Sequence, residues 1–304
     1  MQCIYALVQA KDESLQKQEK FLRFSIENMY TLYLLVLGLL AELHQLAQKH
    51  VSHAEKKYIS TAEDQYPDKE KFVNNQLLLQ IATNPTLSNE LKKRKLDNWN
   101  MHADYVKIIY KDICESDLYK SYMLDQKNSY EKDRDFLIDI FKQIVAPNEK
   151  IYEYFEDDQL TWVDDIPIIN TYLVKHLKKA TSTVSDRFFL PRLLKDEQDM
   201  VFANDLLTKT LLNDAQWEAE IEQKTPNWDN DRIAEVDFIL LKMAICELLN
   251  FPSIPEKVTL NEYLEIAKEY STPKSSIFIN GVLDKLVKEY KSSGRLQKVG
   301  RGLL

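Results

Sequence analysis

The chain has 304 residues, 44% of them hydrophobic, which is enough for a core in one large domain or two. Only five glycines are present and apolar residues recur at helical spacing, which favours an all-helical protein over a sheet. The formal net charge of -8 excludes a surface that attracts polyanions as a whole, so any nucleic-acid site must be a local patch.

The cysteines and the apolar runs indicate where the protein works. Cys3, Cys114 and Cys246 lie far apart without Cys-x-x-Cys spacing, which argues against a disulfide framework or a zinc site. No secretory signal pattern follows Met1, and the most apolar run, residues 30–41, is too short to span a bilayer. We therefore expect a protein of the reducing cytoplasm without a membrane segment.

The N-terminal part is expected to be helical throughout. Apolar residues within positions 1–10 predict a first helix. A second stripe over residues 14–49 predicts one long helix, or two that meet at a bend near Gly38. The polar segment 49–68 is expected to form a loop. Further helices are expected over residues 69–82, 89–95, 99–115, 131–144 and 164–181, with boundaries at Pro85, Pro147 and Pro167.

A helical hairpin is predicted near the C-terminus. Thr259 followed by Glu262 has the pattern of a capping box and predicts the start of one amphipathic helix. Thr272 as N-cap, with Pro273 at the first helical position, predicts the start of the next. The apolar stripe of this second helix is predicted to consist of Ile279, Val282, Leu283, Leu286 and Tyr290. Between the two stripes, residues 271–278 gather amides, hydroxyls, one ammonium and one aromatic ring. A corner of this kind at a helix N-terminus can hold a phosphate.

Three blocks in this region resemble the C-terminal signature of the NusB family of transcription antitermination factors. They are Lys257-Val258-Thr259-Leu260-Asn261-Glu262, Ile266-Ala267-Lys268 and Phe278-Ile279-Asn280-Gly281-Val282-Leu283-Asp284-Lys285. Ala244-Ile245-Cys246-Glu247-Leu248-Leu249 fits the preceding helix of the family. The resemblance covers about residues 199–290, in the order and at roughly the spacing of the family.

The resemblance implies an all-α, NusB-like helical bundle with a large helical insertion, as in a long form of NusB. We expect residues 1–195 to hold the first family helices and the insertion. Residues 196–290 are expected to form the NusB-like core, and residues 291–304 a flexible basic tail.

The resemblance also implies an RNA-binding face around Phe278. Its ring is expected to stack on an unpaired base, although filling the core is the default role of phenylalanine. Lys274, Ser275 and Ser276 are expected to hold phosphate. Asn280 matches the family motif but can equally make a structural hydrogen bond, and we expect Gly281 to permit close helix packing.

The basic tail is a second candidate for phosphate binding. It carries Lys291, Arg295, Lys298 and Arg301 and no acidic residue, which suits either a phosphate-seeking arm or a frayed terminus. In the family an arginine-rich arm precedes the segment that aligns with Ile4-Tyr5-Ala6. The hypothesis is that Arg295 and Lys298 substitute in part for that arm.

Partners follow from the resemblance. The family recognises the boxA element of nascent ribosomal RNA together with the ribosomal small-subunit protein NusE, as part of the RNA polymerase antitermination complex. Tyr5 and Asp237 align with NusE contacts, although both can equally be ordinary surface residues.

No catalytic set is visible, and no cofactor or metal is expected. The sequence has no Gly-rich phosphate loop, no His-Glu-x-x-His and no nucleophile elbow, and the spacing of His44, His50 and His53 does not suit zinc. Glu247 lies on or beside an apolar stripe and is expected to have a structural role. The alternatives are a NusB-like protein-interaction scaffold and an accessory module of an rRNA methyltransferase. The second is disfavoured because no strand-Gly-rich-helix pattern occurs.

Overall fold

The computed structural model describes residues 1–10, 14–57, 65–225 and 233–299, and the described residues form helices and no strand. The all-helical prediction is therefore confirmed. The chain packs as two compact units, residues 1–24 with 194–304 (unit 1) and residues 25–193 (unit 2). The division at residue 194 lies beside the expected one at 195, and the first 24 residues join the C-terminal part.

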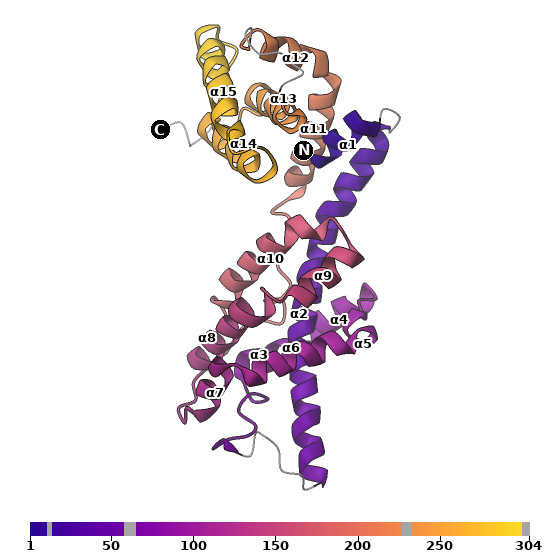
Figure 1. Ribbon diagram of the computed structural model, residues 1–304, viewed down its shortest axis with the longest axis vertical. Helices are drawn as coiled ribbons and strands as arrows, with labels where there is room; N and C mark the ends of the chain where they lie inside the picture. The colour runs from indigo at the N-terminus through magenta and orange to yellow at the C-terminus, as the bar shows by residue number, and fades with distance from the viewer. Residues whose placement is uncertain (11–13, 58–64, 226–232, 300–304) are drawn as a thin grey trace. The chain divides into compact units, whose positions relative to one another are not determined.

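Unit 1 is built around one helix, α13, which packs against α1, α11, α12, α14 and α15. Figure 1 shows α13 among the other helices of this unit. Its sequence is apolar on all sides, and a helix of this kind must be buried. The helices of unit 1 are α1 (Gln2–Ala10), the start of α2 (Leu15–Lys57), α11 (Glu197–Leu212), α12 (Asp214–Glu222), α13 (Glu235–Asn250), α14 (Glu256–Tyr270) and α15 (Ser275–Ser292). The stripe predicted on the last helix is confirmed, because Ile279, Val282, Leu283, Leu286 and Tyr290 are all buried.

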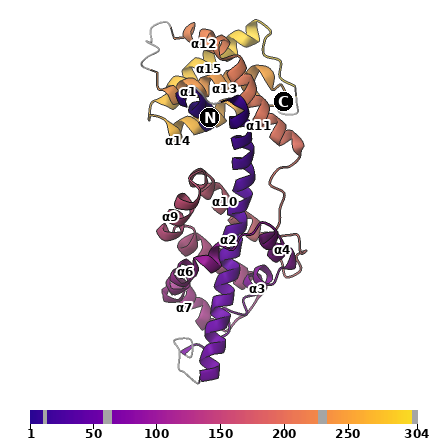
Figure 2. The ribbon, with the colours of Figure 1, turned by 90° about the vertical axis from the view of Figure 1, so that its right-hand side faces the viewer.

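Unit 2 has its own hydrophobic core, formed around the remainder of α2. Figure 2 shows helices on more than one side of this part of α2. They are α3 (Gln76–Ala82), α4 (Pro85–Lys93), α5 (Asn98–Met101), α6 (Ala103–Glu115), α7 (Asp117–Leu124), α8 (Tyr130–Ile140), the π-helical turn η2 (Phe141–Val145), α9 (Glu149–Asp158) and α10 (Trp162–Leu177). The large N-terminal helical region expected from the sequence is thus present.

Helix α2 differs from the prediction in length. It runs as one helix past Gly38 to Lys57, so the chain does not form two helices here, and the loop expected from residue 49 is wrong as far as residue 57. Residues 58–64 lie outside the described part. By length and composition α2 could cross a membrane, with a window of mean hydropathy 1.5. However, 61% of that window is buried within the protein, so its apolar residues serve as core.

Three local start signals were misread because tertiary contacts override them. Pro255 occupies the N-cap of α14, so Thr259 lies inside the helix and the predicted capping box is wrong. α15 begins at Ser275 rather than at Pro273, and Thr272 closes a turn by accepting the Ser275 amide at 2.9 Å. Pro167 lies inside α10 instead of at its boundary.

Gly281 does not permit close packing within the described residues, because it is exposed on α15 and a Cβ there would meet nothing within 4 Å. Replacing it with alanine should raise the free energy of unfolding by about 0.5–1 kcal/mol, because glycine loses more backbone entropy in a helix. Urea denaturation tests this. Gly294→Ala is the matched control. Gly294 also has open space around it, but its φ is +69°, a value that alanine adopts only with strain, so this substitution should destabilise the protein.

A partly buried carboxylate at the start of α10 predicts a dependence on pH. Burial, and then the neighbouring Asp164, raise the pKa of Asp165 to about 6, above the ordinary value of 3.8. The folded state therefore holds the proton more tightly than the unfolded state, and ionisation of Asp165 lowers the free energy of unfolding. This loss is complete at pH 7 and disappears as the pH falls through 6 towards 4. Asp165→Asn should stabilise unit 2 by roughly 1–3 kcal/mol at pH 7 and by little at pH 4. Urea midpoints at the two pH values test this, with the exposed Asp157→Asn as control; equal effects at both pH values would contradict it.

Candidate nucleic-acid interface

The site begins with a buried carboxylate on α13. Glu247 is 6% exposed and accepts hydrogen bonds from Thr259 Oγ1 at 2.7 Å and from Tyr263 Oη at 3.0 Å. Both donors lie on α14, so the carboxylate fixes that helix against α13. Burial, and then the Glu247 charge, raise the pKa of the Tyr263 phenol well above its ordinary value, so the phenol remains a donor. These hydrogen bonds give Glu247 the structural role that the sequence led us to expect.

A second carboxylate fixes the turn between α14 and α15. Asp237, in the first turn of α13, is 5% exposed and accepts a hydrogen bond from Ser271 Oγ at 2.5 Å. Ser271 in turn lies 2.9 Å from the hydroxyl of Ser275, and Thr272 Oγ1 lies 2.8 Å from the same hydroxyl. This chain of hydroxyls holds the first residue of α15 in place. Ser275 is thereby buried, and its hydroxyl has protein partners.

The N-terminus of α15 is left open to ligands. Lys274 occupies the N-cap position, makes no capping hydrogen bond with its side chain and is exposed. The first turn contains no acidic residue, so nothing in it neutralises the positive end of the helix dipole. Ser276 is half-buried, and Ile277 is 74% exposed. The first amides of a helix have no intrahelical acceptor, which makes this end suitable for an anion.

Phe278 lies at the edge of the core. Its ring is partly buried and packs against the hydrophobic cluster of unit 1, so the structure uses it in packing while leaving part of it accessible. Asn280 is also half-buried on α15. All four residues lie within the first two turns of α15, but only Lys274 and Phe278, four positions apart, share a face, while Ser276 and Asn280 lie on the other side of the helix.

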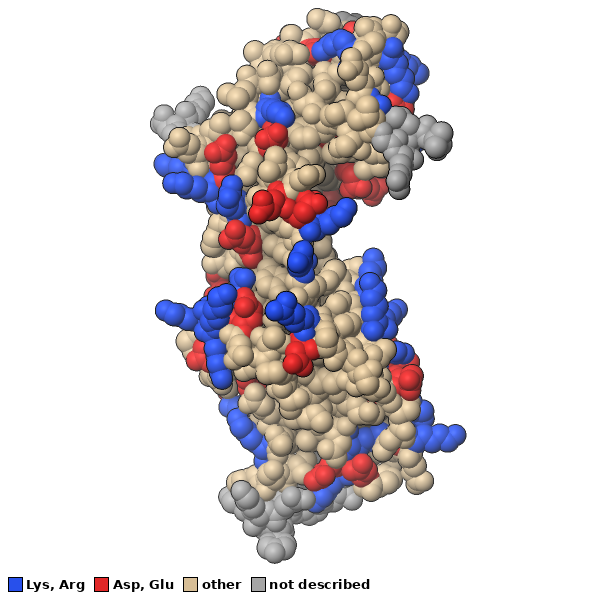
Figure 3. Space-filling model, turned by 180° about the vertical axis from the view of Figure 1, so that it is seen from behind, with Lys and Arg blue, Asp and Glu red and all other residues tan. Residues whose placement is uncertain are grey.

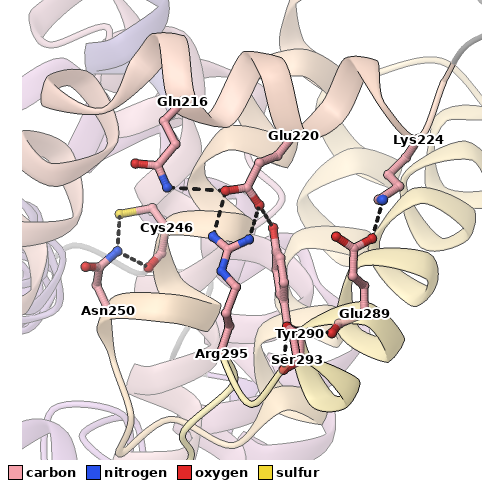
Figure 4. A network of polar contacts seen from close by, with 9 residues as sticks. All are labelled: Gln216, Glu220, Lys224, Cys246, Asn250, Glu289, Tyr290, Ser293 and Arg295. Carbon is pink, nitrogen blue, oxygen red and sulfur yellow. Dashed lines mark hydrogen bonds and ion pairs between the residues drawn. The ribbon is translucent and has the colours of Figure 1, made fainter.

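Arg295 and Lys298 are held at the opposite end of α15, as Figure 4 shows for Arg295. The helix has 18 residues and is about 27 Å long, so these two side chains do not join the corner at Lys274. The Arg295 guanidinium pairs with Glu220 on α12, with Nη2 2.8 Å from Oε1 and Nη1 3.3 Å from Oε2.

The same carboxylate accepts from two further donors, one on α15 and one on its own helix. Tyr290 donates its phenol proton to Glu220, and Gln216 Nε2 donates to Oε1 at 3.2 Å. Burial opposes ionisation of Glu220, but the hydrogen bonds from Arg295, Tyr290 and Gln216 outweigh it and lower its pKa. Nearby, Lys224 pairs with Glu289 (Figure 4).

Lys298 closes the C-terminus of α13. Its Nζ donates to the backbone carbonyls of Glu247 at 3.3 Å and Phe251 at 3.0 Å. Burial lowers the pKa of this ammonium, and the nearby Glu247 carboxylate opposes the shift. Residues expected to form a free tail thus make specific contacts: Val299 N also donates to Pro252 O at 2.8 Å. Arg301 lies outside the described residues.

The two expected partner contacts occupy different environments. Tyr5 lies on α1 with 40% of its surface exposed. Asp237 is buried and directed at Ser271. The sequence placed Ser271 and Thr272 in the candidate corner, but it did not predict the hydroxyl chain that joins them to Asp237 and Ser275.

The charge around the corner is local. Figure 3 shows Lys and Arg interspersed with Asp and Glu on the visible face of each unit. A site of an open helix end, one ammonium and one accessible ring can hold a phosphate and stack a base. Within the described part of the chain, no group of His, Cys, Asp and Glu side chains could hold a metal ion. These features define a helical binding protein.

Comparison with known proteins then identifies the family. The NusB family model matches residues 168–288. A protein of Salinibacter ruber named transcription antitermination protein NusB is 44% identical over 110 residues, which is 36% of this chain and 69% of the relative. Proteins with the same name from Chloroherpeton thalassium and Listeria monocytogenes serotype 4b are 41% and 40% identical, over 35% and 34% of this chain and 50% and 79% of the relatives. No solved structure matches. The chain belongs to the NusB family.

The contact between α13 and α14 gives a test of the buried carboxylate. Thr259→Val keeps the shape of the side chain but leaves Glu247 with one donor fewer, so it should destabilise unit 1 by about 1.5–3 kcal/mol. Tyr263→Phe removes the other donor, and the double variant should be less destabilised than the sum because both bonds end on one carboxylate. Urea unfolding measures the cycle. Strictly additive effects would contradict the shared role. Thr83→Val, at an exposed position in unit 2, is the control.

Proposed function

We propose that this protein acts in transcription antitermination by binding single-stranded RNA at the N-terminus of α15. The observation that carries the proposal is the open helix end with Lys274 at its N-cap beside the accessible edge of Phe278. A phosphate on the amides and the ammonium would place the adjoining base near the ring. The relatives' printed name, transcription antitermination protein, supports the same role.

The finer assignment is that the RNA is the boxA element of nascent ribosomal RNA, bound together with NusE in the cytoplasmic RNA polymerase antitermination complex. The net charge of -8 suits a basic ribosomal partner, because opposite charges speed encounter. We assign Tyr5 as an exposed contact for that partner. Asp237 would act through Ser271, by fixing the turn that precedes the RNA site.

Within this function Lys274 and Phe278 form the central RNA contact, and Ser276 and Asn280 would meet the strand from the other side of the helix start. Ser275 positions the helix end through its hydroxyl partners. Arg295 and Lys298 would support RNA binding indirectly, because they fix α12, α13 and the end of α15. The chemistry is binding alone and requires no cofactor.

Binding of a labelled boxA-type RNA, with and without NusE and at two salt concentrations, tests the proposal. Phe278→Leu keeps apolar volume against the core but removes the ring, so affinity should fall about tenfold, as expected for the loss of one base stack. Lys274→Ala should weaken binding and reduce the salt slope by about 0.7.

Lys288→Ala, at an exposed position farther along the same helix, is the matched control and should change neither quantity. Circular dichroism melts would verify that each variant is folded. Unchanged affinity for both Phe278→Leu and Lys274→Ala, in folded protein, would reject this corner as the RNA site.

A further inference from the structure

A run of four basic residues ends α4 in unit 2 and takes no part in the function proposed above. Lys92, Lys93, Arg94 and Lys95 are all exposed. Arg94 pairs with Glu90 at 2.6 Å and lies over the Tyr30 ring. The three lysines make no ion pair with any described residue, so they form a local positive patch on an acidic protein.

Lys95 has a backbone conformation that favours glycine. Its φ is 57°, and it closes α4 with hydrogen bonds from its own amide to Lys92 O at 3.0 Å and from Leu96 N to Leu91 O at 2.9 Å. Helices commonly end in this pattern with glycine at the left-handed position, and another residue there costs about 1–2 kcal/mol. This backbone outlier directs attention to the Lys95 side chain.

A cavity of about 500 Å³ lies beside this run, within the range of pockets that hold small ligands. It is lined by residues of α2, α3, α4 and α5, and both ribbon views show α4 beside α2 (Figures 1 and 2). Lys92 and Lys95 belong to its lining, whereas Lys93 does not. Two of the unpaired lysines therefore contribute to the lining of a concave site.

The floor of the cavity is apolar and fixed. Trp99 is 5% exposed and donates its Nε1 proton to Leu35 O at 2.8 Å. It packs on Gly38, where a Cβ would lie 3.5 Å from the indole. Ile81 completes this surface from α3. These side chains are almost fully buried, so the apolar surface that they offer to a ligand is small and fixed in position.

The wall of the cavity carries acceptors as well as ammonium groups. Glu42 and Asp97 line it with Asn100, whose amide donates to Asp97 at 2.5 Å. Burial raises the pKa of Glu42, Lys49 opposes the shift and Asp97 adds to it. A wholly anionic or wholly cationic ligand would meet like charges here. A nucleotide suits both the carboxylates and the lysines. The exocyclic amino group of its base can donate to a carboxylate, and its phosphate can pair with lysine.

We propose that this cavity binds one nucleotide whose base carries an exocyclic amino group, with the base in the cavity and the phosphate on Lys92 and Lys95. The nucleotide is either an unpaired residue of an RNA strand or a free nucleotide. The site lies within unit 2 and is independent of the corner on α15.

The test uses the full chain carrying Phe278→Leu, with fluorescein-labelled hexa-adenylate and hexa-uridylate as probes. The adenylate strand should bind more tightly, because uracil lacks an exocyclic amino group. Lys95→Gly removes one ammonium and relieves the backbone, so adenylate affinity should fall several-fold while the melting temperature rises, which separates lost binding from lost folding. Lys93→Ala removes the neighbouring charge outside the cavity and should have a smaller effect.

Ser88→Phe provides an independent test, because Ser88 lines the cavity and a phenyl ring there would fill it while all charges remain. It should abolish the preference for adenylate. Competition by AMP as strong as by the unlabelled strand would assign a free nucleotide, and competition by the strand alone would assign RNA. Equal binding of both strands, equal effects of Lys93→Ala and Lys95→Gly, or no effect of Ser88→Phe would overturn the proposal.

Discussion

Unit 1 depends on the burial of α13 together with its two carboxylates. A charge removed from water is costly unless donors surround it. Glu247 obtains its donors from Thr259 and Tyr263 on α14, and Asp237 obtains one from Ser271 in the following turn. Because both requirements must be met at once, the position of α14 and the start of α15 are fixed relative to the central helix. The candidate RNA site results from this constraint, since its open helix end is held from behind.

The opposite end of the hairpin is fixed in a similar way by basic side chains. Arg295 satisfies the Glu220 carboxylate, and Lys298 satisfies backbone carbonyls at the end of α13. Cations at the C-terminus of a helix also meet the negative end of its dipole. The cationic side chains at the two ends of α15 therefore have different roles: Lys274 is left exposed to solvent, whereas Arg295 and Lys298 bind the protein itself.

In unit 2 a different buried carboxylate likewise joins neighbouring helices through its hydrogen bonds. Asp133 is 4% exposed and accepts hydrogen bonds from Tyr122 Oη at 2.7 Å and from the Gln76 amide at 3.0 Å, which ties α3, α7 and α8 together. Around this polar contact the unit buries a core of its own. A cavity of about 500 Å³ lies beside the exposed basic end of α4, and this is where we place the proposed nucleotide.

The sequence by itself determined the all-helical class, the family blocks and the apolar stripes, because helical periodicity and local motifs are properties of neighbouring residues. It placed Phe278 and Lys274 at one corner for the same reason. Only the tertiary structure decided that Thr259 serves Glu247 instead of capping its helix, that α15 begins at Ser275, and that Lys298 closes α13. Each of these features depends on a partner residue at least twelve positions away, or on a turn that such a partner holds in place. The spacing of neighbouring residues does not predict contacts of that range.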